Sequence, residues 1–237
     1  MASFKELKER IYEANMELPR RGLVMYTFGN ASGIDRDRGV FAIKPSGVPY
    51  NELTPGHMVI VDLDNRFVDG SYNPSSDTRT HSVLYRYFPD IGGVVHTHST
   101  YATSWAQARQ PIPCYGTTHA DHTPNAIPVT VPLSREQIEG DYESETGLRI
   151  VDLFAAAPYN ETPMALVAGH GPFTWGESPE KAVYNSVVLE ELAKMALFTR
   201  MIDSTASSLD KNLIHRHYDR KHGAEATYGQ DMERNEQ

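Results

Sequence analysis

The sequence predicts an α/β fold, with one domain in which helices cover a sheet. Short apolar runs between residues 23 and 61 are separated by Gly, Pro, Asn and Asp, a pattern typical of strands joined by turns. Apolar residues at helical spacing precede and follow these runs. Because the predicted strands lie close together in sequence, we expect much antiparallel pairing. The 237 residues contain 40% hydrophobic and 22% charged side chains, which is the composition of a folded globular chain.

The first predicted element is an amphipathic helix over residues 3 to about 18. Ser3 with Glu6 matches the capping box of a helix start, and Pro19 marks the end of the helix. Three apolar runs follow, and each is expected to form a strand: LVMYTF, GVFAIK and HMVIVDL. A polar loop over residues 72–76 then leads to the next helix.

The middle of the chain alternates helices and strands. Asp77 or Thr78 begins a helix that stops before Pro89, the run IGGVVHTH forms a strand, and Ser99 begins a short helix. Residues 111–132 carry five prolines, which predicts short strands and loops in this stretch.

The last third of the chain is mainly helical. Residues 134–154 predict a helix with a break near Gly147, and the run MALVAGHG predicts a strand that leads into a glycine turn. Ser178 and Pro179 begin a long helix, because Ser is a favoured N-cap and Pro a favoured first helical residue. The last helix is expected over about residues 206–221.

The charge balance and the cysteine content exclude several classes of function. There are 22 Lys and Arg against 31 Asp and Glu, a formal net charge of −9, so we expect no nucleic-acid partner. A small phosphorylated ligand needs only a local pocket of donors and is compatible with this charge. The single cysteine, Cys114, excludes an internal disulfide and a cysteine-based zinc site. The charged N-terminus and the lack of an apolar run of about 20 residues predict a cytoplasmic protein with no membrane partner.

Three histidines at predicted strand ends suggest a metal site. His96 and His98 lie two residues apart on one strand, so their side chains project from the same face and can bind one metal ion together. His170 ends another strand, and Asp77 offers a carboxylate to complete a set of four ligands. The alternative is that each histidine is a polar strand-end residue hydrogen-bonded to the backbone.

Three short segments are typical of anion-binding loops, at residues 29–33, 44–47 and 74–76. They combine small residues, hydroxyl groups and backbone N–H groups, and the second contributes Lys44. A plain turn is the alternative for each of them. Residues 116–122, GTTHADH, gather hydroxyls, imidazoles and a carboxylate, for which a solvated loop is the alternative.

Taken together, these stretches are similar to the class II aldolase family. The matching pieces keep the family's order over about residues 5–230, and residues 231–237 form an extra tail with no assigned role. The pieces are EANMELP, FGNASGIDRDRGVFAIKPSGV, PSSDTRTH, IGGVVHTHS, GTTHAD, ETG, HGPFTWG and HYDRKHGAEATYGQ. The resemblance implies one domain over residues 1–230, an α/β/α sandwich around a mostly antiparallel central sheet. It also implies a homotetramer with cyclic fourfold symmetry and sites at subunit interfaces.

The resemblance assigns roles to single residues. It implies Zn²⁺ as the usual family metal, with Mn²⁺ or Co²⁺ as other options. The implied metal ligands are Asp77, His96, His98 and His170. The implied substrate-binding and phosphate-binding positions are Asn30, Lys44, Ser46, Gly47, Ser75, Ser76, Thr117 and His217. Asp121 and Tyr228 match the acid/base pair, and Tyr228 is expected to reach the site of a neighbouring subunit.

The resemblance implies a sugar phosphate as substrate and the interconversion of L-ribulose 5-phosphate and D-xylulose 5-phosphate. The C4 hydrogen is β to the ketone and not activated, so inversion at C4 requires cleavage of the C3–C4 bond and re-addition to the other face. Family aldolases typically carry Ser-Ser-Glu, with Glu as the base, where this chain has Ser-Ser-Asp at residues 75–77, which favours an epimerase.

Two other hypotheses stay open. One is a class II sugar-phosphate aldolase or lyase that acts on another ketose phosphate. The other is a metal-binding oligomer without catalytic activity, which is disfavoured because all the implied ligands and both acid/base groups are present. A redox route is unsupported, since no glycine-rich dinucleotide-binding fingerprint follows a predicted strand.

Overall fold

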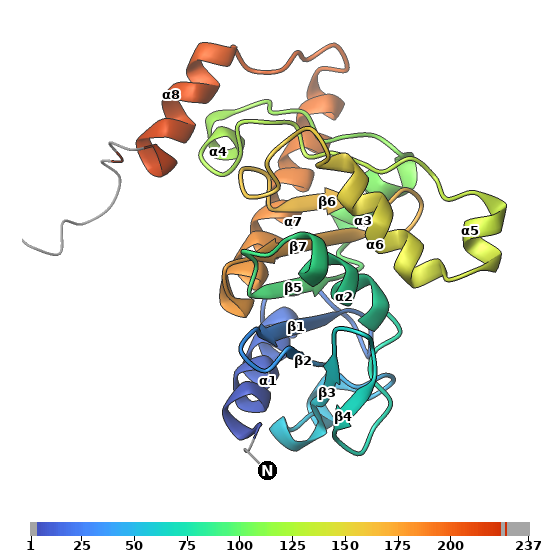
Figure 1. Ribbon diagram of the computed structural model, residues 1–237. Helices are drawn as coiled ribbons and strands as arrows, with labels where there is room; N and C mark the ends of the chain where they lie inside the picture. The colour runs from blue at the N-terminus through green and yellow to red at the C-terminus, as the bar shows by residue number, and fades with distance from the viewer. Residues whose placement is uncertain (1–3, 224–225, 227–237) are drawn as a thin grey trace, which may run out of the picture.

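The computed structural model describes residues 4–223 and 226, and within them seven strands form one sheet (Figure 1). The strand order is β4-β3-β2-β1-β5-β7-β6, and every neighbouring pair is antiparallel. The strands are β1 (Asn30–Asp35), β2 (Val40–Ile43), β3 (Val59–Asp62), β4 (Phe67–Asp69), β5 (Gly93–His96), β6 (Met164–Leu166) and β7 (Pro172–Gly176).

Eight α-helices and two short 3-10 helices accompany the sheet in the described chain. The helices are α1 (Lys5–Arg20), α2 (Thr78–Tyr87), α3 (Thr100–Ala108), α4 (Thr117–Ala120), α5 (Arg135–Glu139), α6 (Tyr142–Leu153), α7 (Pro179–Ile202), α8 (Lys211–His222), η1 (Tyr50–Glu52) and η2 (Pro55–His57). None of these described helices is long and apolar enough to cross a membrane.

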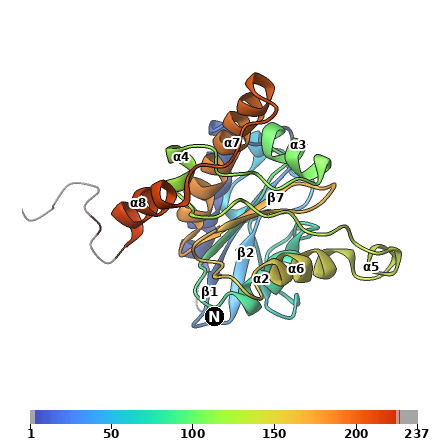
Figure 2. The ribbon, with the colours of Figure 1, turned by 90° about the horizontal axis from the view of Figure 1, so that it is seen from above.

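Helices cover both faces of the sheet, as Figure 2 shows from above. On one face, Phe41 of β2 and Trp175 of β7 pack in one cluster with Leu84 of α2 and Ile150 of α6. The opposite face packs against α1 and α7 in separate clusters, where Ala42 of β2 is one of the contributing strand residues. Successive strand residues point to opposite faces, which is why Phe41 and Ala42 serve different layers. The predicted α/β/α sandwich around an antiparallel sheet is therefore confirmed.

The predicted strand LVMYTF is wrong, and the glycine-rich segment after it forms the central strand β1 instead. Residues 23–28 make a turn in which Tyr26 has a left-handed φ of 53° and the Phe28 N–H bonds the Met25 carbonyl. β1 needs small residues because it pairs on both edges, with β2 and β5, while α1 and α7 press on one face. A Cβ at Gly33 would overlap the Ile11 side chain.

Other predicted boundaries shift, and two further strands were not predicted. The break in the helical stretch falls at Gly140, between α5 and α6, because Asp141 caps a new helix by accepting from the Ser144 N–H. Gly147 instead lies inside α6, where a Cβ would meet Val83 at 2.7 Å. The last helix begins later than predicted, and β4 and β7 are the missed strands. Ser3 and the tail over residues 231–237 lie outside the described residues.

Four strands have a terminus at the same end of the sheet. β2 and β5 end there, whereas β1 and β7 begin there. The register pairs His96 with Asn30 on one side and with Phe173 on the other. Lys44 directly follows β2 and His170 precedes β7. Both residues therefore lie at this end of the sheet.

Candidate functional site

A pocket of about 410 Å³ opens at this end of the sheet. Its lining residues come from five separate segments: Thr27, Phe28, Gly29, Asn30, Lys44, Pro45, Ser46, Gly47, Ser75, Ser76, Asp77, His96, His98 and His170. The structure thus brings the four predicted metal ligands together with six of the predicted phosphate positions, although the segments are up to 140 positions apart in sequence, from residue 30 to residue 170.

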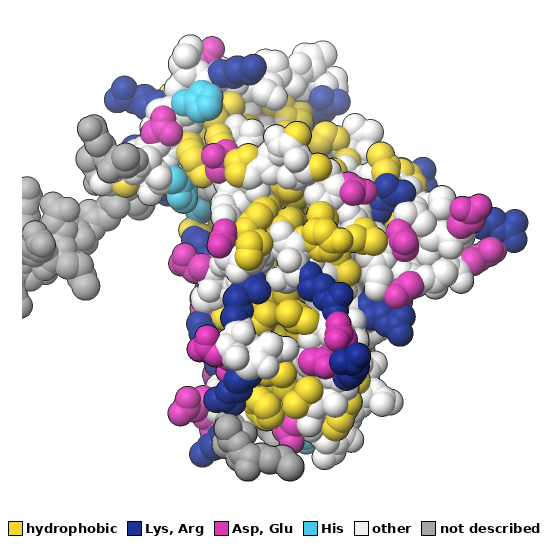
Figure 3. Space-filling model, viewed as in Figure 1, with side chains coloured by type: hydrophobic (Ala, Val, Ile, Leu, Met, Phe, Trp, Pro, Cys, Tyr) yellow, Lys and Arg dark blue, Asp and Glu magenta, His cyan; other side chains and the backbone are white. Residues whose placement is uncertain are grey.

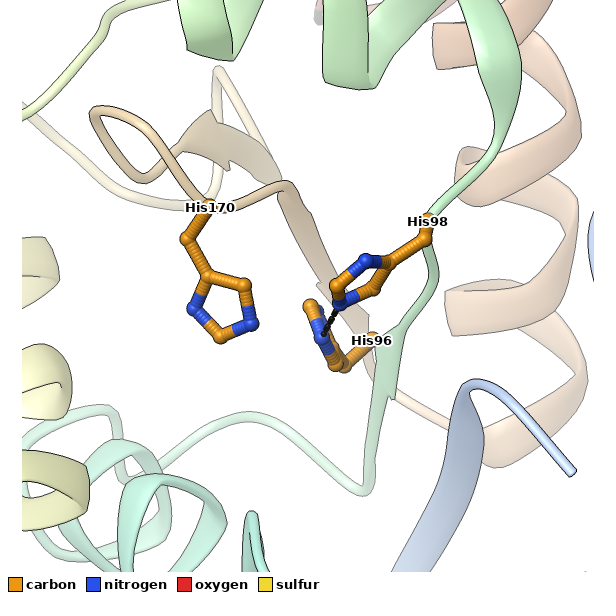
Figure 4. Close-up of side chains that lie close together, drawn as sticks. All are labelled: His96, His98 and His170. Atoms are coloured by element: carbon orange, nitrogen blue, oxygen red, sulfur yellow. Dashed lines mark hydrogen bonds between the residues drawn. The ribbon is translucent and has the colours of Figure 1, made fainter.

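The three histidines converge within the pocket (Figure 4). Each offers a ring nitrogen, and these ligand atoms lie within 4.8 Å of one another. The Nε2 atoms of His96 and His98 are 3.0 Å apart. His96 Nδ1 lies 2.9 Å from the carbonyl oxygen of Pro172, which can only accept, so Nδ1 carries a hydrogen and Nε2 is the ring nitrogen that faces His98. Converging imidazoles with a fixed tautomer fit a divalent cation.

Burial keeps two of these imidazoles in the form that a metal requires. Burial, reinforced by the neighbouring His96, lowers the pKa of both His98 and His170 below the ordinary value of 6.5. Both rings are therefore neutral at pH 7, and a neutral imidazole is the metal-binding form. The Tyr142 hydroxyl lies 3.3 Å from His170 Nδ1 and so orients this ring.

Asp77 lies in the same pocket but outside the tight histidine group. Its Oδ2 accepts a hydrogen bond of 2.7 Å from Asn30 Nδ2. Burial opposes ionisation of Asp77, but its electrostatic interactions with the neighbouring His96 and His81 and the Asn30 hydrogen bond outweigh burial and hold its pKa below the ordinary value. The carboxylate is therefore ionised at neutral pH, as a metal ligand requires.

The phosphate side of the pocket contains a buried cation without a carboxylate partner. The Lys44 side chain is 2% exposed, and its Nζ donates to the carbonyl oxygens of Thr27, at 3.2 Å, and Pro45, at 3.4 Å. Burial lowers the pKa of Lys44 to about 8, so the amine is still mainly protonated at pH 7. Among the described residues no carboxylate forms an ion pair with it. A buried positive charge in a pocket that three serines also line is an environment that suits an anion.

The remaining predicted site residues that the structure describes, Thr117, Asp121 and His217, form a second group at α4 and α8. His217 Nδ1 and Arg220 each lie 3.0 Å from Asp121 Oδ1, and Lys221 is 3.4 Å from Oδ2. Burial opposes ionisation of Asp121, but these partners outweigh burial and lower its pKa. Figure 3 shows basic, acidic and histidine side chains gathered over α4 and α8. Thr117 begins α4 beside this cluster.

This second group does not join the histidine pocket within one chain. Thr117, Asp121 and His217 are not among the described residues that line that pocket. Tyr228 lies outside the described residues. One subunit therefore presents two separate halves of the predicted site.

Sequence reasoning missed several residues at the pocket. Tyr142 lies beside His170 and Tyr50 lies beneath Lys44, and neither gave a signal, because each is a single aromatic residue outside any motif. Gly29 belongs to a predicted anion-binding loop, and the structure shows why this position requires glycine. Its φ is 73°, and a Cβ there would lie 2.9 Å from the carbonyl oxygen of His96. Only glycine allows the turn to approach the metal-site strand so closely.

Known proteins resemble this chain over nearly its whole length. The family model for the Class II Aldolase and Adducin N-terminal domain matches residues 9–197. An L-fuculose 1-phosphate aldolase shares the fold, with a TM-score of 0.77 and 23% identity over 93% of this chain and 97% of that one. YgbL from Escherichia coli, a candidate aldolase/epimerase/decarboxylase, is 27% identical with a TM-score of 0.72, over 90% and 97% of the two chains. YgbL from Klebsiella pneumoniae is 25% identical with a TM-score of 0.69, over 91% and 99%.

Proposed function

Because the chain belongs to the class II aldolase and adducin N-terminal domain family, we propose that it is an L-ribulose-5-phosphate 4-epimerase that depends on a divalent metal. One observation above all supports the proposal. Three converging histidines share one pocket of about 410 Å³ with a buried lysine that has no carboxylate partner among the described residues. This pocket can hold a metal ion and a phosphate group side by side, which is what a ketose phosphate requires.

The proposed metal ligands are the three histidines and Asp77. A metal binds neutral imidazoles and an ionised carboxylate, so the four ligands together would carry one negative charge and a site that holds a divalent ion would keep net positive charge. Zn²⁺ is the proposed ion, because three imidazoles and one carboxylate are a zinc ligand set. When bound, the ion supplies Lewis-acid stabilisation of the negative charge that develops on substrate oxygens.

The proposed phosphate anchor is formed by two groups of donors. Lys44 supplies positive charge, and Asn30 holds Ser75 in place through a hydrogen bond of 3.1 Å. The full proposed set is Asn30, Lys44, Ser46, Gly47, Ser75 and Ser76, with Thr117 and His217 contributed from the second group. Anchoring the phosphate would retain the two-carbon aldehyde fragment while it turns its other face to the three-carbon fragment.

Two groups are proposed to move the proton of the C4 hydroxyl. Cleavage of the C3–C4 bond requires that this proton be removed, and re-addition requires that a proton be returned on the opposite face. Asp121 and Tyr228 are the proposed pair. The short side chain of Asp77, already bonded to Asn30, supports a ligand role for it and not the role of a mobile base.

A homotetramer is proposed because one subunit holds the two halves of the site apart. Asp121 and His217 lie 3.0 Å from each other but outside the histidine pocket of their own chain. A head-to-tail interface would bring the α4 and α8 group of one subunit to the pocket of the next. We place the enzyme in the cytoplasm, in pentose phosphate metabolism such as arabinose catabolism.

The proposal is tested by incubating the metal-loaded protein with L-ribulose 5-phosphate and coupling the product to an enzyme that consumes D-xylulose 5-phosphate. We expect steady product formation that stops when the metal is removed and returns when it is restored. A protein that binds the metal and yet forms no D-xylulose 5-phosphate would contradict the proposal.

A further inference from the structure

We propose that Tyr50 is a positioning residue of the phosphate pocket, which holds the Lys44 ammonium and the turn at residues 27–29 in the geometry that binds phosphate. This inference rests on the proposed function, because it assumes that the Lys44 pocket takes the substrate phosphate. Tyr50 itself does not line the pocket, so its effect on a ligand must pass through Lys44 and the turn.

The hydroxyl of Tyr50 ties down the backbone of the turn. It lies 3.1 Å from the carbonyl oxygen of Phe28 and 3.0 Å from that of Gly29. A phenol has one hydrogen, so the two carbonyls share it. Burial raises the pKa of Tyr50, so the hydroxyl keeps this hydrogen at any physiological pH.

The ring of Tyr50 supports the ammonium of Lys44. Lys44 Nζ lies 4.8 Å from the ring centroid, within the range of a cation–π contact. The remaining partners of Nζ are neutral carbonyls, those of Thr27 and Pro45. An aromatic face and two carbonyls hold the cation without cancelling its charge, whereas a carboxylate partner would compete with the phosphate.

The side chains of Lys44 and Tyr50 together fix the pocket-lining turn at residues 27–29. Lys44 donates to the carbonyl of Thr27, and Tyr50 donates to the carbonyls of Phe28 and Gly29. Three successive carbonyls of the turn therefore accept from two side chains of the segment 44–50. The turn leads directly into Asn30, whose amide bonds both Ser75 and Asp77. Tyr50 is therefore joined to both sides of the phosphate pocket through Lys44 and through the turn.

The Tyr50→Phe variant separates this role from a packing role. The ring belongs to a core cluster with Ile11 and Met58, and phenylalanine keeps that packing and the cation–π contact. Only the hydroxyl bonds to the turn are lost. Tyr85→Phe is a matched control, because Tyr85 is also buried and bonds through its hydroxyl to Ser32, outside the pocket lining.

The experiment measures the dissociation constant of inorganic phosphate for the zinc-loaded enzyme by calorimetry. We expect Tyr50→Phe to raise this constant roughly 3- to 10-fold, as the loss of a modest hydrogen-bond contribution predicts. KM for the sugar phosphate should rise in parallel, with kcat and bound zinc unchanged. Tyr85→Phe should leave the phosphate constant at the wild-type value. In the Lys44→Met background, the effect of Tyr50→Phe on phosphate should shrink, because the turn that the Tyr50 hydroxyl holds is also bonded to Lys44 Nζ through the Thr27 carbonyl.

The outcomes separate failure of this inference from failure of the proposed function. If the wild-type enzyme binds phosphate and Tyr50→Phe binds it equally well, or no worse than Tyr85→Phe does, Tyr50 has no positioning role. If Tyr50→Phe lowers zinc content and phosphate affinity together, its role is structural and the inference is wrong. If the wild-type enzyme binds no phosphate, or Lys44→Met binds it as tightly, the phosphate pocket itself is misplaced and the proposed function loses its main support.

Discussion

His96 Nδ1 donates to the carbonyl oxygen of Pro172, 2.9 Å away, and this bond joins the end of β5 to the start of β7. The ring also stacks on Phe173, with centroids 4.2 Å apart. Because the acceptor is backbone and the strands are paired in register, the tautomer and the orientation of the ring are set before any ligand binds. Nε2 then points at His98, so the sheet itself prepares the pair.

The first prediction concerns metal content. We expect one divalent ion per chain, and we expect His96→Asn or His170→Asn to lose it, because each substitution removes one of three converging nitrogens. Folding should be kept, since both residues lie at the ends of strands and line the pocket. Elemental analysis measures the ion, and circular dichroism checks the fold. His215→Asn, on the exposed side of α8, is the control and should retain the metal. Metal-free protein with activity that survives strong chelators would show that the site is not a metal site.

The second prediction concerns the phosphate loops. Lys44→Met should raise KM for the phosphorylated substrate roughly 10- to 100-fold, because a hydrogen bond to a charged group is worth about 1.5–3 kcal/mol. Ser46→Ala should raise it by a smaller factor. Unphosphorylated L-ribulose serves as the control substrate, and its weak turnover should change little. Wild-type KM values in both variants would put the phosphate elsewhere.

The third prediction is a pH dependence of stability that arises from His81. This residue is fully buried, and burial lowers its pKa from 6.5 to about 3. Between those values the unfolded chain binds a proton that the folded chain excludes, so the free energy of unfolding falls as the pH falls. The contribution is absent above pH 6.5 and grows by about 1 kcal/mol per pH unit below it.

The comparison is between the wild-type protein and His81→Asn, both stripped of metal with a chelator and unfolded in urea at pH 4 to 7. Asparagine can still bond Ser32, which lies 2.7 Å from His81 Nδ1, but it does not titrate. The variant should show the shallower slope over this range. Parallel slopes would mean that His81 is not excluded from protonation in the folded state.

The fourth prediction distinguishes an epimerase from an aldolase. An epimerase must retain its aldehyde until the C3–C4 bond forms again, so free glycolaldehyde phosphate should stay far below the amount of D-xylulose 5-phosphate. Trapping of released aldehyde during turnover measures the ratio. Stoichiometric aldehyde with no D-xylulose 5-phosphate would assign the chain to the lyases.

The fifth prediction concerns assembly. If each site combines a metal pocket from one subunit with Tyr228 from the next, the inactive variants His96→Asn and Tyr228→Phe should complement each other. In a randomly mixed ring about a quarter of the interfaces pair an intact metal pocket with an intact Tyr228. Co-refolding should therefore recover activity that approaches a quarter of the wild-type activity. The activity of each variant alone is subtracted, because loss of one acid/base group costs about 10²–10⁴-fold.

Asp121→Asn paired with His96→Asn extends this test to the described part of the chain, where Asp121 lies outside its own subunit's pocket. Mixed rings that are no more active than the separate variants would show that each subunit completes its own site.

The sequence by itself determined the fold class and most of the helices, and it singled out most of the residues that line the pocket. Helix starts are local events: Ser178 accepts from the Lys181 N–H, and Asp77 sits at the start of α2, as the residue types indicated. Strand alternation is also local, and it indicated that His96 and His98 belong together.

Only the tertiary structure decided where the chain makes a turn and how the site is divided. The apolar run at residues 23–28 has strand propensity. In the fold, however, Lys44 and Tyr50 donate hydrogen bonds to the carbonyls of residues 27–29, from 17 to 22 positions away in sequence. The separation of Asp121 from the histidines likewise depends on α8, whose His217 is 96 positions from Asp121. Propensity and periodicity report the preferences of neighbouring residues, whereas these outcomes depend on which distant groups satisfy a buried carbonyl or carboxylate.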